Sequence, residues 1–211
     1  MKNITKAMIC GILITSVIMC GCAYSENVQG GIAKEVIRFH VLANSDEYED
    51  QELKMIVRDG ILDLLSGTLD MCKTVSETRI ALTENLEAIE TAAREIIAAN
   101  GYNYDVRAEL TTEMFPTRIY DGAAFPAGKY EALRISIGEG SGKNWWCMMF
   151  PPLCFIDATQ PKMENSSKDK LKNILTDEEL GVVLNSGNNQ GYKAKFFVVE
   201  TFQKIKNRIM G

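Results

Sequence analysis

Ten residues near the start of the chain, Ile37-Arg-Phe-His-Val-Leu-Ala-Asn-Ser-Asp46, decide the fold. Apolar and polar side chains alternate from Glu35 to Ala43, with Ile37, Phe39 and Val41 on one side and Arg38 and His40 on the other. Such alternation predicts a strand with one apolar face. The next residues, Asn44-Ser45-Asp46, are typical of a turn and a helix N-cap, and the acidic residues up to Asp50 suit the positive end of a helix. The stretch therefore predicts a strand that turns directly into a helix.

Two amphipathic helices are predicted after this turn. In the first, Leu53, Ile56, Val57, Ile61, Leu64 and Leu65 recur at helical spacing. The second runs from Ser76 to Ala99, and its apolar stripe consists of Leu82, Leu86, Ile89, Ala93, Ile96 and Ile97. Asn100-Gly101 then supplies a helix stop. The stripe spans too few heptads to favour a coiled coil, so we expect this helix to pack on the sheet.

Three further segments have strand patterns: Asp105–Thr112, Lys129–Ile137 and Asn144–Phe150. The last is aromatic and apolar throughout, which is typical of a strand buried on both faces. Between the last two, Gly138-Glu-Gly-Ser-Gly-Lys143 predicts a tight connection of hairpin type. The expected fold class is α+β with two layers, in which a mainly antiparallel sheet of about four strands packs with two or more amphipathic helices.

The end of the chain predicts a more polar region. Asp157 to Asp169 reads as a loop, and Thr176 suits the cap of a short helix from Asp177 to Leu184. A closing helix is indicated by Phe197, Val198, Phe202, Ile205 and Ile209. The chain thus divides into an export signal (1–23), a polar lead-in (24–34), a core domain (35–157) and a C-terminal loop and helical segment (158–211).

The first 23 residues are typical of an export signal. Lys2 and Lys6 form the charged start, and an apolar run follows from Ala7 to Met19. This run is shorter than the roughly 20 apolar residues that a membrane span needs, which favours cleavage over permanent anchoring.

Three ways of processing this signal are open. Met19-Cys20-Gly21-Cys22 resembles a bacterial lipobox, in which Cys22 would carry the lipid, although such boxes usually have other residues at positions 19 and 20. Gly21-x-Ala23 also suits ordinary cleavage after Ala23, and an uncleaved anchor is the third possibility. All three place the rest of the chain outside the cytoplasm.

The charge of the chain excludes some partners. The formal net charge is -5, and removing residues 1–22 takes away two lysines and no acid, leaving 21 basic against 28 acidic side chains, or -7. An acidic protein is poorly suited to nucleic acid or to anionic lipid. We therefore expect no nucleic-acid partner, and contact with a membrane only through a lipid anchor or an uncleaved signal.

Three cysteines lie outside the signal: Cys72, Cys147 and Cys154. An odd number in an oxidising compartment indicates one bridge and one remaining thiol. Cys147 and Cys154 are the natural pair, because the two prolines between them bend the segment back on itself. The alternative is that both are buried free thiols that pack as small apolar side chains.

Nucleophilic and metal chemistry find little support. His40 is the only histidine, and its partner in a Cys–His nucleophile would be Cys72, which lies in a polar connection. A zinc site formed by His40, Cys147 and Cys154 lacks the compact spacing of such sites. We interpret His40 as a hydrogen-bonded residue on the sheet surface.

Other catalytic patterns are equally unspecific. Asp121, Glu131 and Glu139 could form a pair of glycosidase carboxylates, but nothing in the sequence sets their separation. Gly138-x-Gly-x-Gly142 joins two predicted strands, whereas a nucleotide-binding loop joins a strand to a helix. We predict no catalytic, cofactor-binding or metal-binding residue, and no enzymatic activity.

Two Phe-Pro segments favour a binding function instead. They are Phe115-Pro-Thr-Arg-Ile-Tyr120 and Phe125-Pro-Ala-Gly-Lys-Tyr130, and Trp145-Trp146 adds further aromatic side chains. Tyr, Trp and Arg dominate protein interfaces, and proline limits the entropy that is lost on docking. The alternative is that these rings fill the core, and adjacent tryptophans in a strand must point to opposite faces.

These segments resemble the stage II sporulation protein R family. The resemblance includes Ile37–Asp46, Asp50-Gln51 with Lys54, Val57-Arg-Asp59, Phe115-Pro-Thr-Arg118, Phe125-Pro-Ala-Gly128, Tyr130-Glu-Ala-Leu-Arg134, Ile137-Gly138, Gly142-x-Asn-Trp-Trp-Cys147 and Phe150-Pro-Pro-Leu-Cys154. It covers roughly residues 35 to 156, with its motifs in order. It implies a protein made in the forespore and exported into the intermembrane space. There it would activate a membrane-embedded aspartic protease of the mother cell that processes pro-sigma-E.

We expect activation to occur by docking. The predicted contact residues are Arg38, His40, Arg118, Tyr120 and Trp145. The competing hypothesis, from another functional class, is an exported peptidoglycan hydrolase or wall-binding protein.

Overall fold

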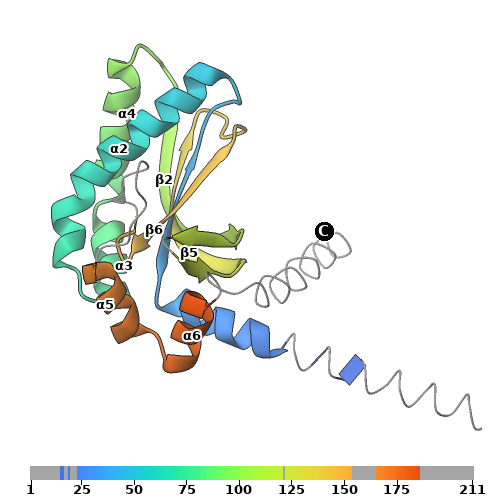
Figure 1. Cartoon of the computed structure of the whole chain (residues 1–211). Coiled ribbons are helices and arrows are strands. Elements are labelled where there is room, and N and C mark those ends of the chain that lie inside the picture. Colours follow the sequence, from blue (N-terminus) through green and yellow to red (C-terminus); the bar gives the residue numbers. More distant parts are fainter. Residues whose placement is uncertain (1–14, 17–18, 20–22, 121, 154–164, 186–211) are drawn as a thin grey trace, which may run out of the picture.

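A four-stranded sheet forms the centre of the protein. The computed structural model describes residues 15–16, 19, 23–120, 122–153 and 165–185 (Figure 1). The strands are β1 (Ile37–Leu42), β2 (Val106–Phe115), β5 (Gly128–Ile137) and β6 (Asn144–Phe150), in the order β2-β5-β1-β6. Of the three pairings, β2–β5 and β1–β6 are antiparallel and β1–β5 is parallel. The α+β prediction is confirmed.

Strand β1 occupies an inner position with both faces covered. Its apolar residues Ile37, Phe39 and Val41 are fully buried, as the alternation predicts. Its other face is buried as well, since Arg38 is 0% exposed and His40 is 3% exposed. The interpretation of His40 as a surface residue is therefore wrong. Alternation shows which residues share a face, but it cannot show whether the polar face is covered.

Three helices cover one face of the sheet: α2 (Tyr48–Met71), α3 (Val75–Glu84) and α4 (Leu86–Ala99) (Figure 1). They share one core with the sheet, which includes Leu53, Val57, Ile61, Leu65, Leu69, Leu82, Ile89, Ala93 and Ile97 from the helices. Ile56 and Leu64, predicted for the apolar stripe, are 44% and 47% exposed. When α2 is drawn at 100° per residue, Ile56 lies outside the buried stripe, and Leu64 lies within it near the same edge.

The predicted single helix from Ser76 to Ala99 is two helices joined at Asn85. Asn85 has φ -101° and ψ 3°, and its side-chain amide donates to the Ala81 carbonyl oxygen at 2.8 Å. A short amide side chain that competes for backbone groups in this way favours a helix end over a helix interior. Gly101, with φ +84°, follows the C-cap of α4 and confirms the predicted stop.

The turn before α2 is built differently from the predicted N-cap. The N-cap position is Glu47, and its side chain makes no capping hydrogen bond. Instead Asn44 and Ser45 donate to the Asp50 carboxylate at 2.9 and 2.6 Å. Burial works to raise the pKa of Asp50, but the hydrogen bonds from Ser45, Asn44 and Tyr104 outweigh it and lower that pKa.

The connection from Gly138 to Lys143 is not a hairpin, because β1 lies between the two strands it joins. The connection crosses the end of β1, where Ser141 N–H donates to the Asn44 carbonyl and Gly142 N–H to the Ala43 carbonyl. Gly138 and Gly140 have positive φ angles, 56° and 61°, which glycine adopts without strain. A glycine-rich link of this length fits a hairpin or a crossing over one strand equally well.

A second, smaller layer covers part of the other face of the sheet. It consists of a helix at residues 23–34, the two-stranded pair β3 (Arg118–Tyr120) and β4 (Ala123–Phe125), and helices α5 (Asn165–Ile174) and α6 (Asp177–Asn185) (Figure 1). Its core includes Val28, Ile32, Phe115, Phe125, Tyr130, Met148, Leu153, Leu171 and Val183. The polar lead-in is thus helical with a buried apolar side, despite its two glycines.

The C-terminal predictions are confirmed in part. Glu179 N–H donates to the Thr176 hydroxyl at 3.3 Å, so Thr176 caps α6 as expected. Residues 165–169, predicted as loop, begin α5. The predicted closing helix, Cys22 and most of the predicted export signal lie outside the described residues. In the described part of the chain, none of the helices has the length and apolar character that crossing a membrane requires.

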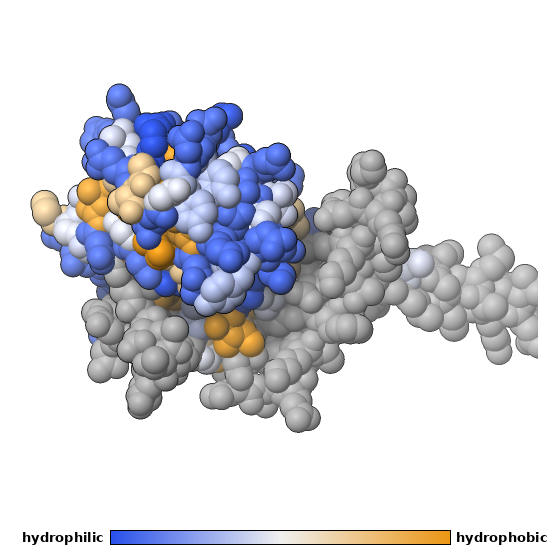
Figure 2. All heavy atoms as spheres, turned by 90° about the horizontal axis from the view of Figure 1, so that it is seen from above, coloured by the Kyte–Doolittle hydropathy of each residue, from blue (hydrophilic) through white to orange (hydrophobic). Residues whose placement is uncertain are grey.

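Seen from above, the described surface is mainly hydrophilic, and its apolar side chains form small separate patches (Figure 2). This view offers no broad apolar docking surface. The groups of functional interest lie instead on the second face of the sheet.

Candidate interaction site on the second face of the sheet

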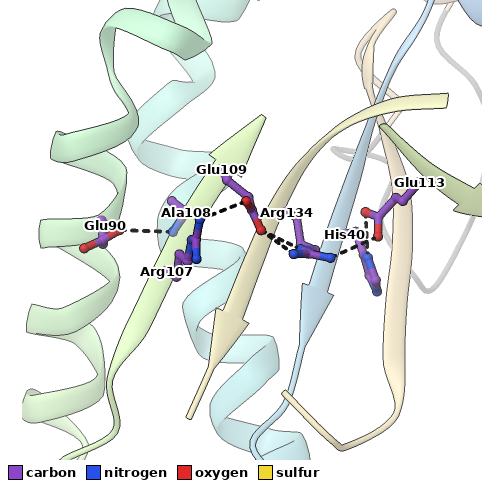
Figure 3. Close-up of polar contacts among 7 residues, drawn as sticks. All are labelled: His40, Glu90, Arg107, Ala108, Glu109, Glu113 and Arg134. Carbon is purple, nitrogen blue, oxygen red and sulfur yellow. Dashed lines mark hydrogen bonds and ion pairs between the residues drawn. The ribbon is translucent and has the colours of Figure 1, made fainter. Parts of the chain in front are cut away.

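A row of polar and aromatic side chains crosses all four strands on this face. Pairing places Trp146 of β6 beside His40 of β1, His40 beside Arg134 of β5, and Arg134 beside Glu109 of β2. Directly paired residues in adjacent strands point to the same face, so register alone brings these four side chains together. We call them, together with Glu113 and Asn144, the polar row; Figure 3 shows its part from Glu109 to His40.

His40 is held on three sides. Its Nδ1 lies 2.8 Å from Glu113 Oε1, and its Nε2 lies 2.7 Å from Asn144 Oδ1. The ring stacks on Trp146 with centroids 3.7 Å apart. Two hydrogen-bonding contacts and one stacked ring therefore fix the position of the imidazole.

The acidic and basic members of the row form a connected network. Arg134 donates from Nε to Glu109 at 3.0 Å, and its Nη1 lies 3.8 Å from Glu113 Oε2. Arg107 extends the network outward, 3.4 Å from Glu109 (Figure 3). Side-chain exposure falls from 76% at Arg107 to 35% at Arg134, 16% at Glu113 and 4% at His40. The row therefore leads from solvent to a buried imidazole.

The next residue of β1 on this face, Arg38, is enclosed by rings. Its guanidinium carbon lies 4.6 Å from the ring centroid of Phe115, 5.2 Å from Tyr130, 5.7 Å from Tyr120 and 5.9 Å from Phe125. Arg38 is 0% exposed, and Nε, Nη1 and Nη2 have no hydrogen-bond partner among the described residues. We call this arrangement the Arg38 cage. Its walls come from the sheet, through Phe115 and Tyr130, and from β3 and β4, through Tyr120 and Phe125.

The cage and the polar row touch each other. Phe115 packs edge-on against Trp146, with centroids 4.5 Å apart, and lies 6.0 Å from His40. Tyr130 donates its hydroxyl to the Pro126 carbonyl at 2.7 Å, and burial raises the pKa of Tyr130 to about 12, against the opposing influence of Arg38. The second face thus holds one continuous group of aromatic, charged and hydrogen-bonding side chains.

The structure separates the five predicted contact residues. Arg38 and His40 are buried, so in this conformation neither side chain is accessible to a partner, and their role as contact residues stays a prediction. Trp145 points to the helix face, where it packs edge-on against Phe39 at 5.6 Å and lies under Arg58 at 4.8 Å. Arg118 is exposed and Tyr120 is half-buried, and both lie on β3.

Sequence reasoning missed most of the polar row. Glu109, Glu113 and Arg134 carry no motif, and their relation depends on the pairing of β2 with β5. Charged residues at alternate positions of one strand segment, Arg107, Glu109 and Glu113, are a signal that points to such a row.

The structure does not bring together those candidate residues for chemistry that it describes. Cys147 is a buried thiol that packs in the helix-face core, whereas His40 points to the opposite face. Glu131 forms a salt bridge with Arg79 at 2.9 Å. Among the described residues, no three His, Cys, Asp or Glu side chains form a group that could hold a metal ion. Asp121 and Cys154 lie outside them, so the bridge between Cys147 and Cys154 stays a prediction.

Comparison with known proteins identifies the family. Residues 33–160 match the family described as stage II sporulation protein R. The chain is 33% identical over 187 residues to stage II sporulation protein R of Bacillus subtilis (strain 168), which covers 83% of this chain and 84% of that protein. No solved structure matches the chain. The chain therefore belongs to the stage II sporulation protein R family.

Proposed function

We propose that this protein is a secreted sporulation signal that activates a membrane-embedded aspartic protease by docking on it. It would be made in the forespore, exported into the intermembrane space, and lead to processing of pro-sigma-E by the protease of the mother cell. Membership of the family supports the role in sporulation. The export signal and the resemblance of the Phe-Pro segments support the rest.

The observation that carries the proposal is the hairpin formed by β3 and β4. Arg118 and Ile119 are both exposed and, as neighbours in a strand, point to opposite faces of the hairpin. Ile119 is 57% exposed, although it is a large apolar residue. The hairpin is fixed to the sheet by Tyr120 and Phe125, which enclose Arg38. An exposed cation beside an exposed apolar side chain is suited to protein contact.

Activation follows if the docked hairpin binds the active arrangement of the protease more tightly than the inactive one. A ligand shifts a conformational equilibrium only by its difference in affinity for the two states. The protein then needs no bond-making chemistry of its own.

Reconstitution tests the proposal. This chain is expressed with the protease and its pro-sigma-E substrate in a host that does not sporulate, and processing is followed on gels. We expect processing only when all three proteins are present. Arg118→Ala should abolish processing while secretion and the circular dichroism spectrum stay unchanged.

Arg94→Ala is the matched control, since Arg94 is an exposed arginine of α4 on the opposite side of the sheet. It should activate as the unchanged protein does. Normal processing with Arg118→Ala would remove the hairpin from the mechanism. Cleavage of purified wall by the isolated protein would refute a signal without catalysis.

A further inference from the structure

Among the described residues, the positive charge of the Arg38 cage has no counterion. An aromatic wall attracts a cation through the ring faces, and four rings lie within 6 Å of this guanidinium carbon. A ring face, however, is a much weaker hydrogen-bond acceptor than an oxygen atom for the five N–H groups of a guanidinium. With Nε, Nη1 and Nη2 buried and unpartnered among the described residues, the cage stabilises the charge and leaves its donors unused.

A buried unpaired cation is costly to a folded protein. An apolar side chain of similar length would fill the same aromatic space without that cost. The charge therefore points to a group outside the described residues that uses it. A carboxylate fits best, because its two oxygens match the planar fork of a guanidinium in a bidentate pair.

Entry to the cage leads through the hairpin. Two of the four walls, Tyr120 and Phe125, belong to β3 and β4, which pair over only three residues each. The other two walls, Phe115 and Tyr130, belong to the main sheet. All three residues of β4 are buried, whereas Arg118 and Ile119 of β3 are exposed. Only three paired residues hold β3 and its Tyr120 wall, so β3 separates at a smaller free energy than the central strands do. Arg118, exposed on the same hairpin, adds positive charge where an acidic group would approach.

We propose that the Arg38 cage is a carboxylate-binding site, and that its occupant is an acidic side chain of the protein on which the hairpin docks. The identity of that protein rests on the function proposed above, whereas the carboxylate site does not. Docking displaces β3 with its Tyr120 wall, the acidic side chain enters, and the guanidinium donates two hydrogen bonds to it.

Small anions test the site without any partner. The Nε–Hε NMR signal of Arg38 is assigned in the full-length protein by its loss in Arg38→Met, with Arg94→Met as the matched control that retains it. Sodium acetate is then titrated at constant ionic strength against sodium chloride, with phosphate as a second anion. We expect a saturable shift of the Arg38 signal with acetate and none with chloride.

Two results would overturn the assignment. One is an Arg38 signal that stays unchanged at every acetate concentration at which the protein is folded. The other is a stronger response to phosphate than to acetate, which would indicate a different class of ligand.

Arg38→Met provides the second test, in the reconstituted host. Since it replaces an unpaired buried charge by an apolar side chain, its melting temperature should equal or exceed that of the unchanged protein. Processing should nevertheless fall at least tenfold. Normal processing by folded Arg38→Met refutes an acidic side chain of the protease as the occupant, and if the variant does not fold, the acetate titration decides on the site itself.

The two proposals fail separately. If the unchanged protein activates no protease, the proposed function is wrong, while the acetate titration still establishes or refutes the carboxylate site.

Discussion

The two faces of the central sheet differ in the kind of side chain that packs against them. The helix face of β1 carries Ile37, Phe39 and Val41 in a core that is apolar throughout. The second face of the same strand carries Arg38 and His40, whose surroundings are rings, carboxylates and amides. Both faces are buried, so burial does not distinguish them. The helix face needs only apolar volume, whereas the second face needs particular atoms at particular places, and that requirement is typical of function.

The largest expected effect is on the helix face. Phe39→Ala removes a fully buried ring between the sheet and the helices and should lower the free energy of unfolding by about 3–5 kcal/mol. Urea unfolding followed by circular dichroism measures it. Ile56→Ala, at a 44% exposed position of α2, is the control and should change the free energy by about 0.5 kcal/mol or less. Equal losses for both would show that the helix face is not a close-packed core.

The second face should respond to high pH through Tyr130. Its pKa is raised from 10.0 to about 12 in the folded protein, so folding keeps the proton on. The stabilisation is complete below pH 10, the value of the unfolded chain, and is lost as the pH rises through 12. Its full size is about 2–3 kcal/mol.

Tyr130→Phe should remove this loss from the pH dependence of unfolding. At neutral pH the variant should cost only about 1 kcal/mol, for the hydrogen bond to the Pro126 carbonyl. Unfolding curves with and without the substitution, measured between pH 9 and 12 in urea, give both quantities. An unchanged slope in the variant would show that the Tyr130 hydroxyl is not buried as described.

Glu113→Gln should cost about 1–3 kcal/mol, because the Glu113 carboxylate is only 16% exposed and contacts both His40 and Arg134. The effect is measured as the change in the urea midpoint at pH 7. Combining it with His40→Gln tests the contact directly, since additive losses would mean that the two side chains do not interact.

The smallest effect is expected at the outer end of the polar row. Glu109 and Arg134 are 26% and 35% exposed, and water screens such pairs. Glu109→Gln should therefore change the free energy of unfolding by about 0.2–1 kcal/mol, and less in 1 M salt. A larger loss than that of Glu113→Gln would reverse the order of burial along the row.

The sequence predicted the helix face well and the second face poorly. Periodicity identified β1, both helical regions and the cap at Thr176, because these features depend on neighbours in the chain. It could not show that β1 lies between β5 and β6, which makes the connection at Gly138 a crossing. The break at Asn85 was also missed, because one amide interrupts an apolar stripe that otherwise continues.

For the candidate site, too, the sequence predicted what depends on neighbouring residues and missed what depends on distant ones. The Phe-Pro segments were recognised as unusual, and they supply the walls of the Arg38 cage. Their burial, and the opposite orientation of Trp145, depend on register and covering layers that are set by distant parts of the chain. Arg38 was predicted as a contact from its type alone, and only the structure shows that its donors are enclosed.

The place of β1 between two later strands has a consequence for biogenesis. Phe39 pairs with Leu133 on one side and with Cys147 on the other, so the first strand to be synthesised has no neighbour until nearly the whole core sequence exists. Pairings so distant along the chain form late and slowly. The sheet of a chain with this order of strands can close only after β6 has been synthesised, so β1 stays without a paired strand through most of the synthesis of the core.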